Sequence, residues 1–173
     1  MIVVPYTEIS PATREAVPDA LFVEVDESDG YRLLLADMWE RKEAFTLVEH
    51  DVIPTREQLD ALDACPEPWC HYGYFPGHWV PVFGCVRFSA ELIAGTQGVW
   101  DNEAWQWSQL DMKFATVVWE RGWRAHWHSP HVRHGGTTFV DESGAHRGEL
   151  SEWMLRYTID VETRRLRDLG LPV

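Results

Sequence analysis

Ala44-Phe45-Thr46-Leu47-Val48-Glu49-His50-Asp51-Val52-Ile53-Pro54-Thr55 is the stretch of sequence that decides the fold. Its first residues are aromatic, aliphatic and β-branched, which is typical of a buried strand, and a proline closes the segment. Two acids, Glu49 and Asp51, follow the strand on one face of an extended chain. In an open α/β sheet, ligands bind beyond the carboxyl ends of the strands. Two interpretations remain: the acids form a site, or they solvate a loop entering a helix at Thr55, which has capping-box spacing to Gln58.

The composition is that of one globular domain. The chain has 173 residues, of which 45% are hydrophobic and 25% charged. Its net charge of −13 argues against non-specific binding of nucleic-acid phosphates. Three cysteines, Cys65, Cys70 and Cys85, match no zinc-finger spacing, and nothing resembles a signal peptide, so we expect reduced thiols and a cytoplasmic protein. No apolar run approaches the ~18 residues that a membrane span needs, so we expect no membrane partner.

Strands and helices alternate along the first part of the chain. Short strands are expected at 2–6 and 21–25, and apolar residues from Tyr31 onward follow the helical spacing i, i+3, i+4, i+7. The strand of the opening stretch and a helix after Thr55 come next. This order predicts an α/β layer with a mainly parallel sheet. A further strand is expected at 82–88, followed by helices that begin at Ser89 and Ser108.

Ten tryptophans and eight histidines are the unusual features of the composition. Trp100, Trp105 and Trp107 either stack on a sugar or base or pack on the domain, and we favour packing because Trp is largely buried on average. Four histidines fall within nine residues, and on a strand the first two share a face. We expect at least one of them to bind a metal or phosphate, since neutral imidazole is the commonest metal ligand. They are His126, His128, His131 and His134.

Several segments occur in an order that carries a resemblance. They are the strand Ile2-Val3-Val4-Pro5-Tyr6, the strand ending in Glu49-His50-Asp51-Val52-Ile53-Pro54, the strand and helix at 83–92, Leu110-Asp111, Arg121-Gly122, and Pro130-His131-Val132-Arg133-His134. Over residues 1–136 the chain resembles the GT-A class of nucleotide-sugar glycosyltransferases, in a short, family-2-like form. It departs from the family pattern in two places: Glu49 stands where aspartate is commoner, and Leu110-Asp111 replaces the usual Glu-Asp pair.

The resemblance implies a fold and a division of the chain. The fold is a GT-A-like, Rossmann-like three-layer sandwich with a mainly parallel central sheet. Residues 1–173 would form a single catalytic domain. Within it, 1–60 would be the nucleotide and metal half, 80–136 the acceptor and base half, and 148–170 a C-terminal helix.

The resemblance also implies an activity, which is metal-dependent transfer of a sugar from a nucleotide-sugar donor to an acceptor hydroxyl. Asp51 would bind Mn²⁺ or Mg²⁺ directly, and Glu49 would be a second ligand or contact the donor ribose. His134, which comes late in the chain, would be the remaining metal ligand. Asp111 would act as the base, giving inversion by direct displacement. The leaving nucleotide is highly charged, which is why a cation is needed.

Binding residues follow from the same resemblance. The donor would contact Pro5, Tyr6, Thr7, Asp26 and His50, and the sugar or acceptor would contact Arg87 and Trp107. The acceptor, whether a small molecule, a protein or a modified nucleic acid, is not identified by the sequence. A homodimer would form by pairing of the C-terminal helix with a second copy.

Two other functions fit parts of the sequence. His126, His128 and either His131 or His134 would hold Zn²⁺ with a bound water in a small hydrolase. Alternatively, the tryptophans would bind carbohydrate without chemistry, in a non-catalytic module that keeps its affinity when Asp111 is changed to Asn. Tightly bound zinc would favour the first alternative.

Overall fold

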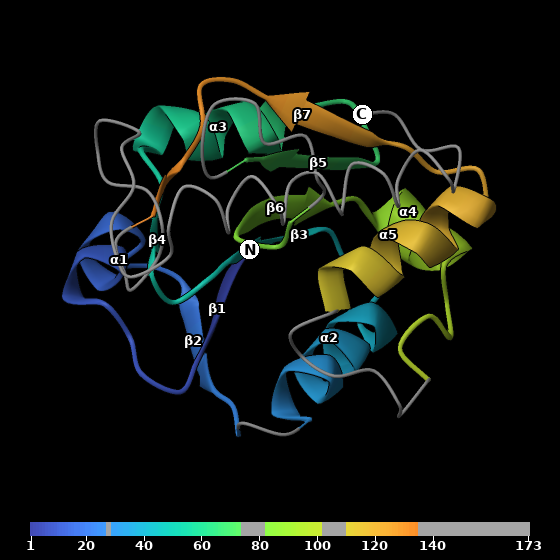
Figure 1. Ribbon diagram of the computed structural model, residues 1–173, viewed down its shortest axis with the longest axis horizontal. Coiled ribbons are helices and arrows are strands. Elements are labelled where there is room, and N and C mark those ends of the chain that lie inside the picture. The colour runs from blue at the N-terminus through green and yellow to red at the C-terminus, as the bar shows by residue number, and fades with distance from the viewer. Residues whose placement is uncertain (27–28, 74–81, 102–109, 135–173) are drawn as a thin grey trace, which may run out of the picture.

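The computed structural model describes residues 1–26, 29–73, 82–101 and 110–134 (Figure 1). A six-stranded sheet forms its centre, with the strand order β2-β1-β3-β6-β5-β7. The strands of this sheet are β1 (Ile2–Tyr6), β2 (Leu21–Glu24), β3 (Phe45–Val48), β5 (Trp69–Tyr72), β6 (Cys85–Phe88) and β7 (Ala125–His128).

The directions of the strands decide which strand ends lie together at each edge of the sheet. β1 is parallel to β2 and to β3, and β5 is parallel to β7. β6 runs antiparallel to both β3 and β5, so it joins two parallel blocks that point the same way. The carboxyl ends of the other five strands therefore lie at one edge of the sheet, which is where an α/β sheet binds its ligands.

Helices cover both faces of the sheet, as the apolar strand residues require. On one face lie α2 (Gly30–Glu40), α4 (Ala90–Gly95) and α5 (Leu110–Glu120), and on the other lie α1 (Pro11–Ala16) and α3 (Arg56–Ala64). The first face is dominated by aromatic rings. Trp39 packs edge-on against Phe45, Phe88 and Phe114, and Trp100 stacks on Phe114 with 5.1 Å between ring centroids.

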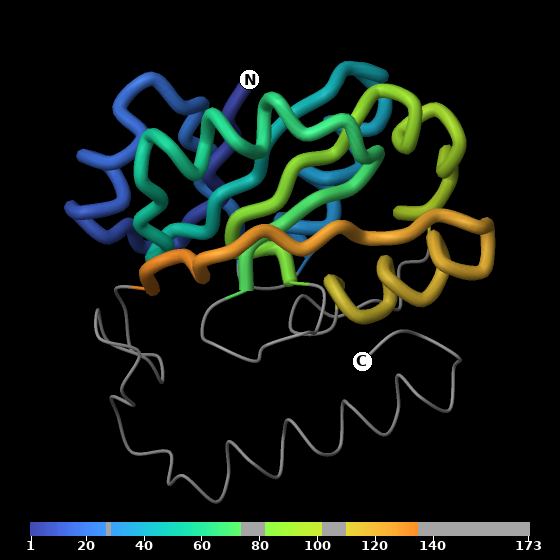
Figure 2. Tube along the Cα trace, turned by 90° about the horizontal axis from the view of Figure 1, so that it is seen from above, coloured from blue at the N-terminus to red at the C-terminus, as the bar shows by residue number. Residues whose placement is uncertain are grey.

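A second, two-stranded sheet lies beyond the end of β3. β4 (Val52–Ile53) pairs antiparallel with β8 (Arg133–His134), and Val52 is opposite His134. The chain from β7 to β8 crosses the molecule from the end of α5 to the start of α3 (Figure 2). This crossing brings the late histidine segment to the acids that follow β3.

The predicted α/β class, with a mainly parallel sheet between helical layers, is confirmed. Local signals explain the helix starts: Thr55 accepts a hydrogen bond from the Gln58 N–H at 3.2 Å, and Gln58 Oε1 accepts one from the Thr55 N–H at 2.9 Å, as the capping-box spacing predicts. Ser89 caps α4 as expected.

Trp100 is buried, so its predicted packing is confirmed. No described helix is both long and apolar enough to cross a bilayer.

Some expectations fall outside the described residues. Trp105, Trp107 and the helix start at Ser108 lie there, as does the C-terminal helix at 148–170 with the proposed dimer contact.

Candidate functional site

The loop after β3 is held by backbone hydrogen bonds. The N–H of Glu49 donates to the carbonyl of Gly84 at 2.9 Å, and the N–H of Val52 donates to the carbonyl of Glu49 at 3.0 Å, which closes a tight turn. The carbonyl of His50 accepts from the N–H of Ser10 at 3.0 Å. Glu49, His50 and Asp51 thus leave the sheet in a fixed direction.

The small sheet places His134 against this loop. The Nε2 atom of His134 is 3.5 Å from Oδ1 of Asp51, and Nε2 of His50 is 3.9 Å from Oδ2 of the same carboxylate. Ligand atoms of Glu49, Asp51 and His134 all lie within 4.8 Å of one another. The structure therefore brings together the three residues that were predicted as metal ligands. We call Glu49, Asp51 and His134 the carboxylate site.

Further contacts fix the chain that carries His134. The Gln58 side chain donates from Nε2 to the carbonyl of His131 at 3.1 Å, and the N–H of Val132 donates to the carbonyl of Gly73 at 3.0 Å. Val132 is fully buried. The first turn of α3 and the end of β5 therefore both position the segment that delivers the imidazole.

Burial favours the neutral form of that imidazole. His134 is 8% exposed, and this burial lowers its pKa; the Asp51 carboxylate opposes the shift, and His50 adds to it. A lowered pKa favours the neutral ring, which is the form that binds metals. Two carboxylates with one neutral imidazole are a donor set that suits Mn²⁺ and also accommodates Mg²⁺, so the residues fit the metal expected from the sequence.

Asp111 is connected with the same site by its effect on the pKa of Tyr31. The phenol of Tyr31, on α2, has its pKa raised well above 10.0 by burial first, and then by the carboxylates of Glu49 and Asp111. The charges of both acids act on the same phenol, which links Asp111 electrostatically with Glu49. Asp111 is in the first turn of α5, and its Oδ1 accepts the N–H of Met112 at 2.7 Å. Tyr31 was assigned only to an apolar helix stripe by the sequence, which carries no signal for its polar end.

The residues expected to bind a donor lie at the same edge of the sheet. Pro5 and Tyr6 end β1 beside the end of β2, and Thr7 follows exposed. Asp26 comes just after β2, where its Oδ1 accepts the N–H groups of Asp29 and Gly30 at 3.1 and 2.9 Å. One oxygen of Asp26 thus holds the start of α2, and donor contacts by these residues stay predictions.

Arg87 lies elsewhere. It pairs with Thr46 at the start of β3 and with Cys70 on β5, and its Nη1 is 3.4 Å from the carbonyl of Cys65. β6 runs antiparallel to β3, so its first residue, Cys85, is the one nearest Glu49. Arg87 comes later in the strand and lies away from the carboxylate site. The structure does not bring Arg87 together with Glu49, Asp51 and His134.

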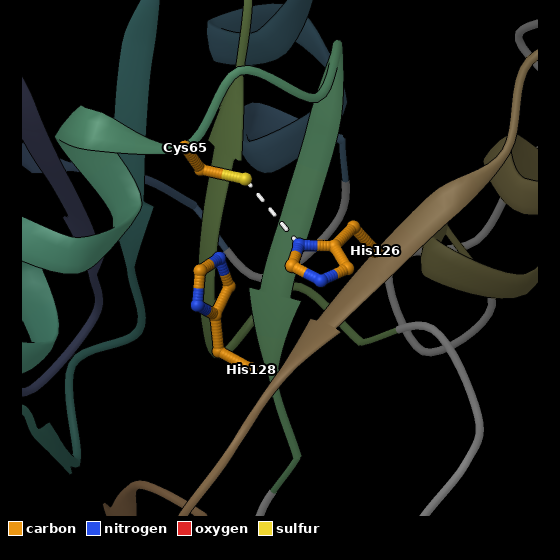
Figure 3. Close-up of side chains that lie close together, drawn as sticks. All are labelled: Cys65, His126 and His128. Atoms are coloured by element: carbon orange, nitrogen blue, oxygen red, sulfur yellow. Dashed lines mark hydrogen bonds between the residues drawn. The ribbon is translucent and has the colours of Figure 1, made fainter.

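A second group of ligand-type side chains lies beside Arg87. Cys65, His126 and His128 offer ligand atoms within 4.8 Å of one another (Figure 3). We call them the thiol site. The expected zinc set paired His126 and His128 with His131 or His134; in the structure Cys65 completes the group, and His134 lies with Asp51. Cys65 and His126 are 61 residues apart, and no spacing rule applied to the sequence joins them.

Comparison with known proteins gives structural neighbours only. No protein-family model and no curated protein matches the sequence. Among solved structures, A197 from STIV superposes with a TM-score of 0.56 at 12% identity, covering 87% of this chain and 95% of that one. This likeness shows a shared fold.

Two other solved structures match at lower scores. One is a glycosyltransferase involved in the glycosylation of the major capsid of PBCV-1, with a TM-score of 0.48, 13% identity, and coverage of 75% of this chain and 81% of that chain. The other is a putative glucose-1-phosphate thymidylyltransferase from Bacillus anthracis, with a TM-score of 0.42, 9% identity, and coverage of 77% and 69%.

Proposed function

We propose that the chain is a metal-dependent glycosyltransferase that moves a sugar from a nucleotide-sugar donor to an acceptor hydroxyl. The observation that carries this proposal is the meeting of Asp51 and His134, 3.5 Å apart, at the carboxyl edge of a mainly parallel sheet. The Rossmann-like arrangement puts ligands at this edge, and the donor set suits a hard divalent cation.

Asp51, Glu49 and His134 would hold Mn²⁺ or Mg²⁺, which when bound neutralises charge that develops on the leaving diphosphate. The lowered pKa of His134 supports this role because the ring is kept neutral for coordination. Pro5, Tyr6 and Thr7 border the same edge, where they would contact the nucleotide.

Asp111 is the base of the proposed reaction. Its carboxylate would take the proton of the acceptor hydroxyl as the oxygen attacks the anomeric carbon, with inversion at that carbon. The shared influence of Glu49 and Asp111 on the pKa of Tyr31 supports the role, because it indicates that the proposed base lies near the proposed ligand.

The test is release of nucleoside diphosphate from a panel of nucleotide sugars, with and without candidate acceptors. We expect release to require Mn²⁺ or Mg²⁺ and to stop on chelation with EDTA. No release from any donor in the panel would contradict the proposed activity.

The role of Asp111 is tested by comparing two variants of α5. Asp111→Asn should reduce transfer by about 10²–10⁴-fold, the range of a general base, while donor binding measured by calorimetry changes little. Glu120→Gln, at the exposed end of the same helix, is the matched control and should transfer normally. Normal turnover in Asp111→Asn would remove this residue from the mechanism.

A further inference from the structure

The thiol site brings together two elements that are far apart in the sequence. Cys65 is the C-cap of α3, and His126 and His128 lie on β7, at one end of the strand order of the large sheet in the described part of the chain. The two histidines share one face of β7, as alternation on a strand requires, and their ring centroids are 4.7 Å apart. In Figure 3 both rings lie on the side of β7 that faces the Cys65 sulfur.

The spacing of the donor atoms fits a tetrahedral metal. Sγ of Cys65 is 3.3 Å from Nδ1 of His126. With metal bonds of about 2.3 Å to sulfur and about 2.0–2.1 Å to nitrogen, tetrahedral Zn²⁺ holds its sulfur and nitrogen ligands about 3.5 Å apart. A small shift of either side chain brings the pair to this separation.

The surroundings of the group favour coordination as well. Cys65 is 7% exposed, and Nε2 of His128 is buried with no hydrogen-bond partner among the described residues. Burial lowers the pKa of His128, and neighbouring His126 adds to the shift, so the neutral ring is favoured. An unpaired buried imidazole nitrogen costs free energy that a metal bond removes.

We propose that Cys65, His126 and His128 bind one Zn²⁺ ion, at a site separate from the carboxylate site. The proposal does not rest on the glycosyltransferase function. Binding replaces the proton of the Cys65 thiol by the metal and releases that proton to solvent, so no oxidant or reductant takes part. The chain supplies three ligands, and water takes the fourth position.

The site is distant from the proposed catalytic metal. α3 begins at Arg56, five residues after Asp51, and its nine residues end at Ala64, directly before Cys65. At about 1.5 Å per residue the helix separates the two groups by roughly 13 Å. Zinc would therefore tie the far end of α3 to β7 without contacting a substrate at the carboxylate site.

Co²⁺ titration of the untagged full chain tests the proposal first. Co²⁺ replaces Zn²⁺ in such sites, and a thiolate ligand produces a charge-transfer absorption in the near ultraviolet. We expect this absorption to saturate at one equivalent and to disappear when one equivalent of Zn²⁺ is added. Absence of the absorption in the wild-type chain would mean that Cys65 and His126 share only a hydrogen bond, and would overturn the proposal.

Variants then identify the ligands. Cys65→Ala and His126→Ala should each lose the absorption, and Zn²⁺ should dissociate from them during dialysis, whereas Cys85→Ala, which removes another buried thiol, should keep both. Persistence of the absorption in Cys65→Ala would overturn the assignment. Zinc content by elemental analysis of the wild-type chain, purified without added metal, gives a result that depends on no variant; we expect about one equivalent.

The outcome is separate from that of the proposed enzyme activity. Asp51→Asn should leave the cobalt absorption and the zinc content unchanged. A chain that binds zinc but releases no nucleoside diphosphate would support the thiol site and contradict only the glycosyltransferase. Loss of the cobalt absorption in Asp51→Asn would show that the thiol site is not independent, and would overturn the proposal as stated.

Discussion

The carboxylate site and the thiol site lie near the two ends of α3, and apart from the imidazole that both contain they offer different ligand atoms. The first offers two carboxylates and an imidazole, and the second a thiol and two imidazoles. Hard oxygen ligands suit Mn²⁺ and Mg²⁺, whereas sulfur and nitrogen ligands suit Zn²⁺. If both proposals hold, the comparison teaches that ligand chemistry separates a metal for reaction from a metal for structure within one small domain.

The largest expected effect separates the two sites by function. Asp51→Asn removes a charged ligand of the carboxylate site, and we expect turnover to fall by about 10²–10³-fold, similar to loss of an electrostatic group in other active sites. Cys65→Ala should keep turnover within about threefold at a temperature where it is folded. Both are measured by diphosphate release. Equal losses in the two variants would break the distinction between the sites.

Metal removal should separate them by stability. Zinc held at about 100 times its dissociation constant adds about 2.7 kcal/mol to the free energy of unfolding. For a chain of this size that corresponds to about 5–10 °C in melting temperature. A zinc-selective chelator should therefore lower the melting temperature of the wild-type chain but not of Cys65→Ala. Scanning calorimetry with and without the chelator measures this difference, and identical shifts in the two proteins would contradict it.

Gln58→Ala should affect the carboxylate site from outside it. The variant loses half of the capping box and the hydrogen bond to the His131 carbonyl, and we expect about 1–2 kcal/mol of lost stability. Because the same bond positions the chain before His134, Mn²⁺ should bind more weakly.

The matched control for Gln58→Ala is Asp63→Asn, an exposed position of the same helix, which should change neither property. Urea unfolding and Mn²⁺ calorimetry measure the two effects. A variant that is less stable but binds Mn²⁺ normally would show that α3 does not position His134.

Tyr31→Phe should give the smallest effect, visible only at alkaline pH. The Tyr31 pKa is raised above 10.0, by burial first and then by Glu49 and Asp111. Above pH ~10 the unfolded chain releases this proton while the folded chain keeps it, so the wild type loses stability as pH rises. Relative to Tyr31→Phe, the loss should be about 1 kcal/mol near pH ~10.5. Urea unfolding at several pH values measures it, and parallel curves for the two proteins would contradict the raised pKa of the buried Tyr31 phenol.

The sequence predicted local features better than distant ones. Apolar patterns located the strands and helices, and Thr55 with Gln58 predicted the capping box, because these signals lie within a few residues. The meeting of Asp51 and His134 came from resemblance, since no periodicity joins β4 to β8. Physical reasoning from the sequence could place each residue on an element, but not the elements against one another.

Direction within the sheet explains why the sequence did not show that Arg87 lies apart from the carboxylate site, or that Cys65 lies beside His126. A strand pattern is the same whether the strand runs parallel or antiparallel, so the sequence does not reveal that β6 turns Arg87 toward the opposite edge. Cys65 was considered only by spacing to other cysteines, whereas its neighbour His126 lies across the fold on β7. The sequence placed Tyr31 on an apolar helix stripe. Only the structure shows that Glu49 and Asp111 act on the pKa of its hydroxyl.

The pairing of β4 with β8 has a consequence for folding kinetics. Val52 and His134 come from opposite parts of the described chain, so forming this ladder closes a very long loop for only two pairs of residues. Loop-closure entropy opposes such contacts until the large sheet has already brought the two segments near each other. We expect the sheet and its aromatic core to form first and the proposed metal-binding pair, Asp51 and His134, to assemble last, so that a nearly complete fold exists briefly without its proposed active centre.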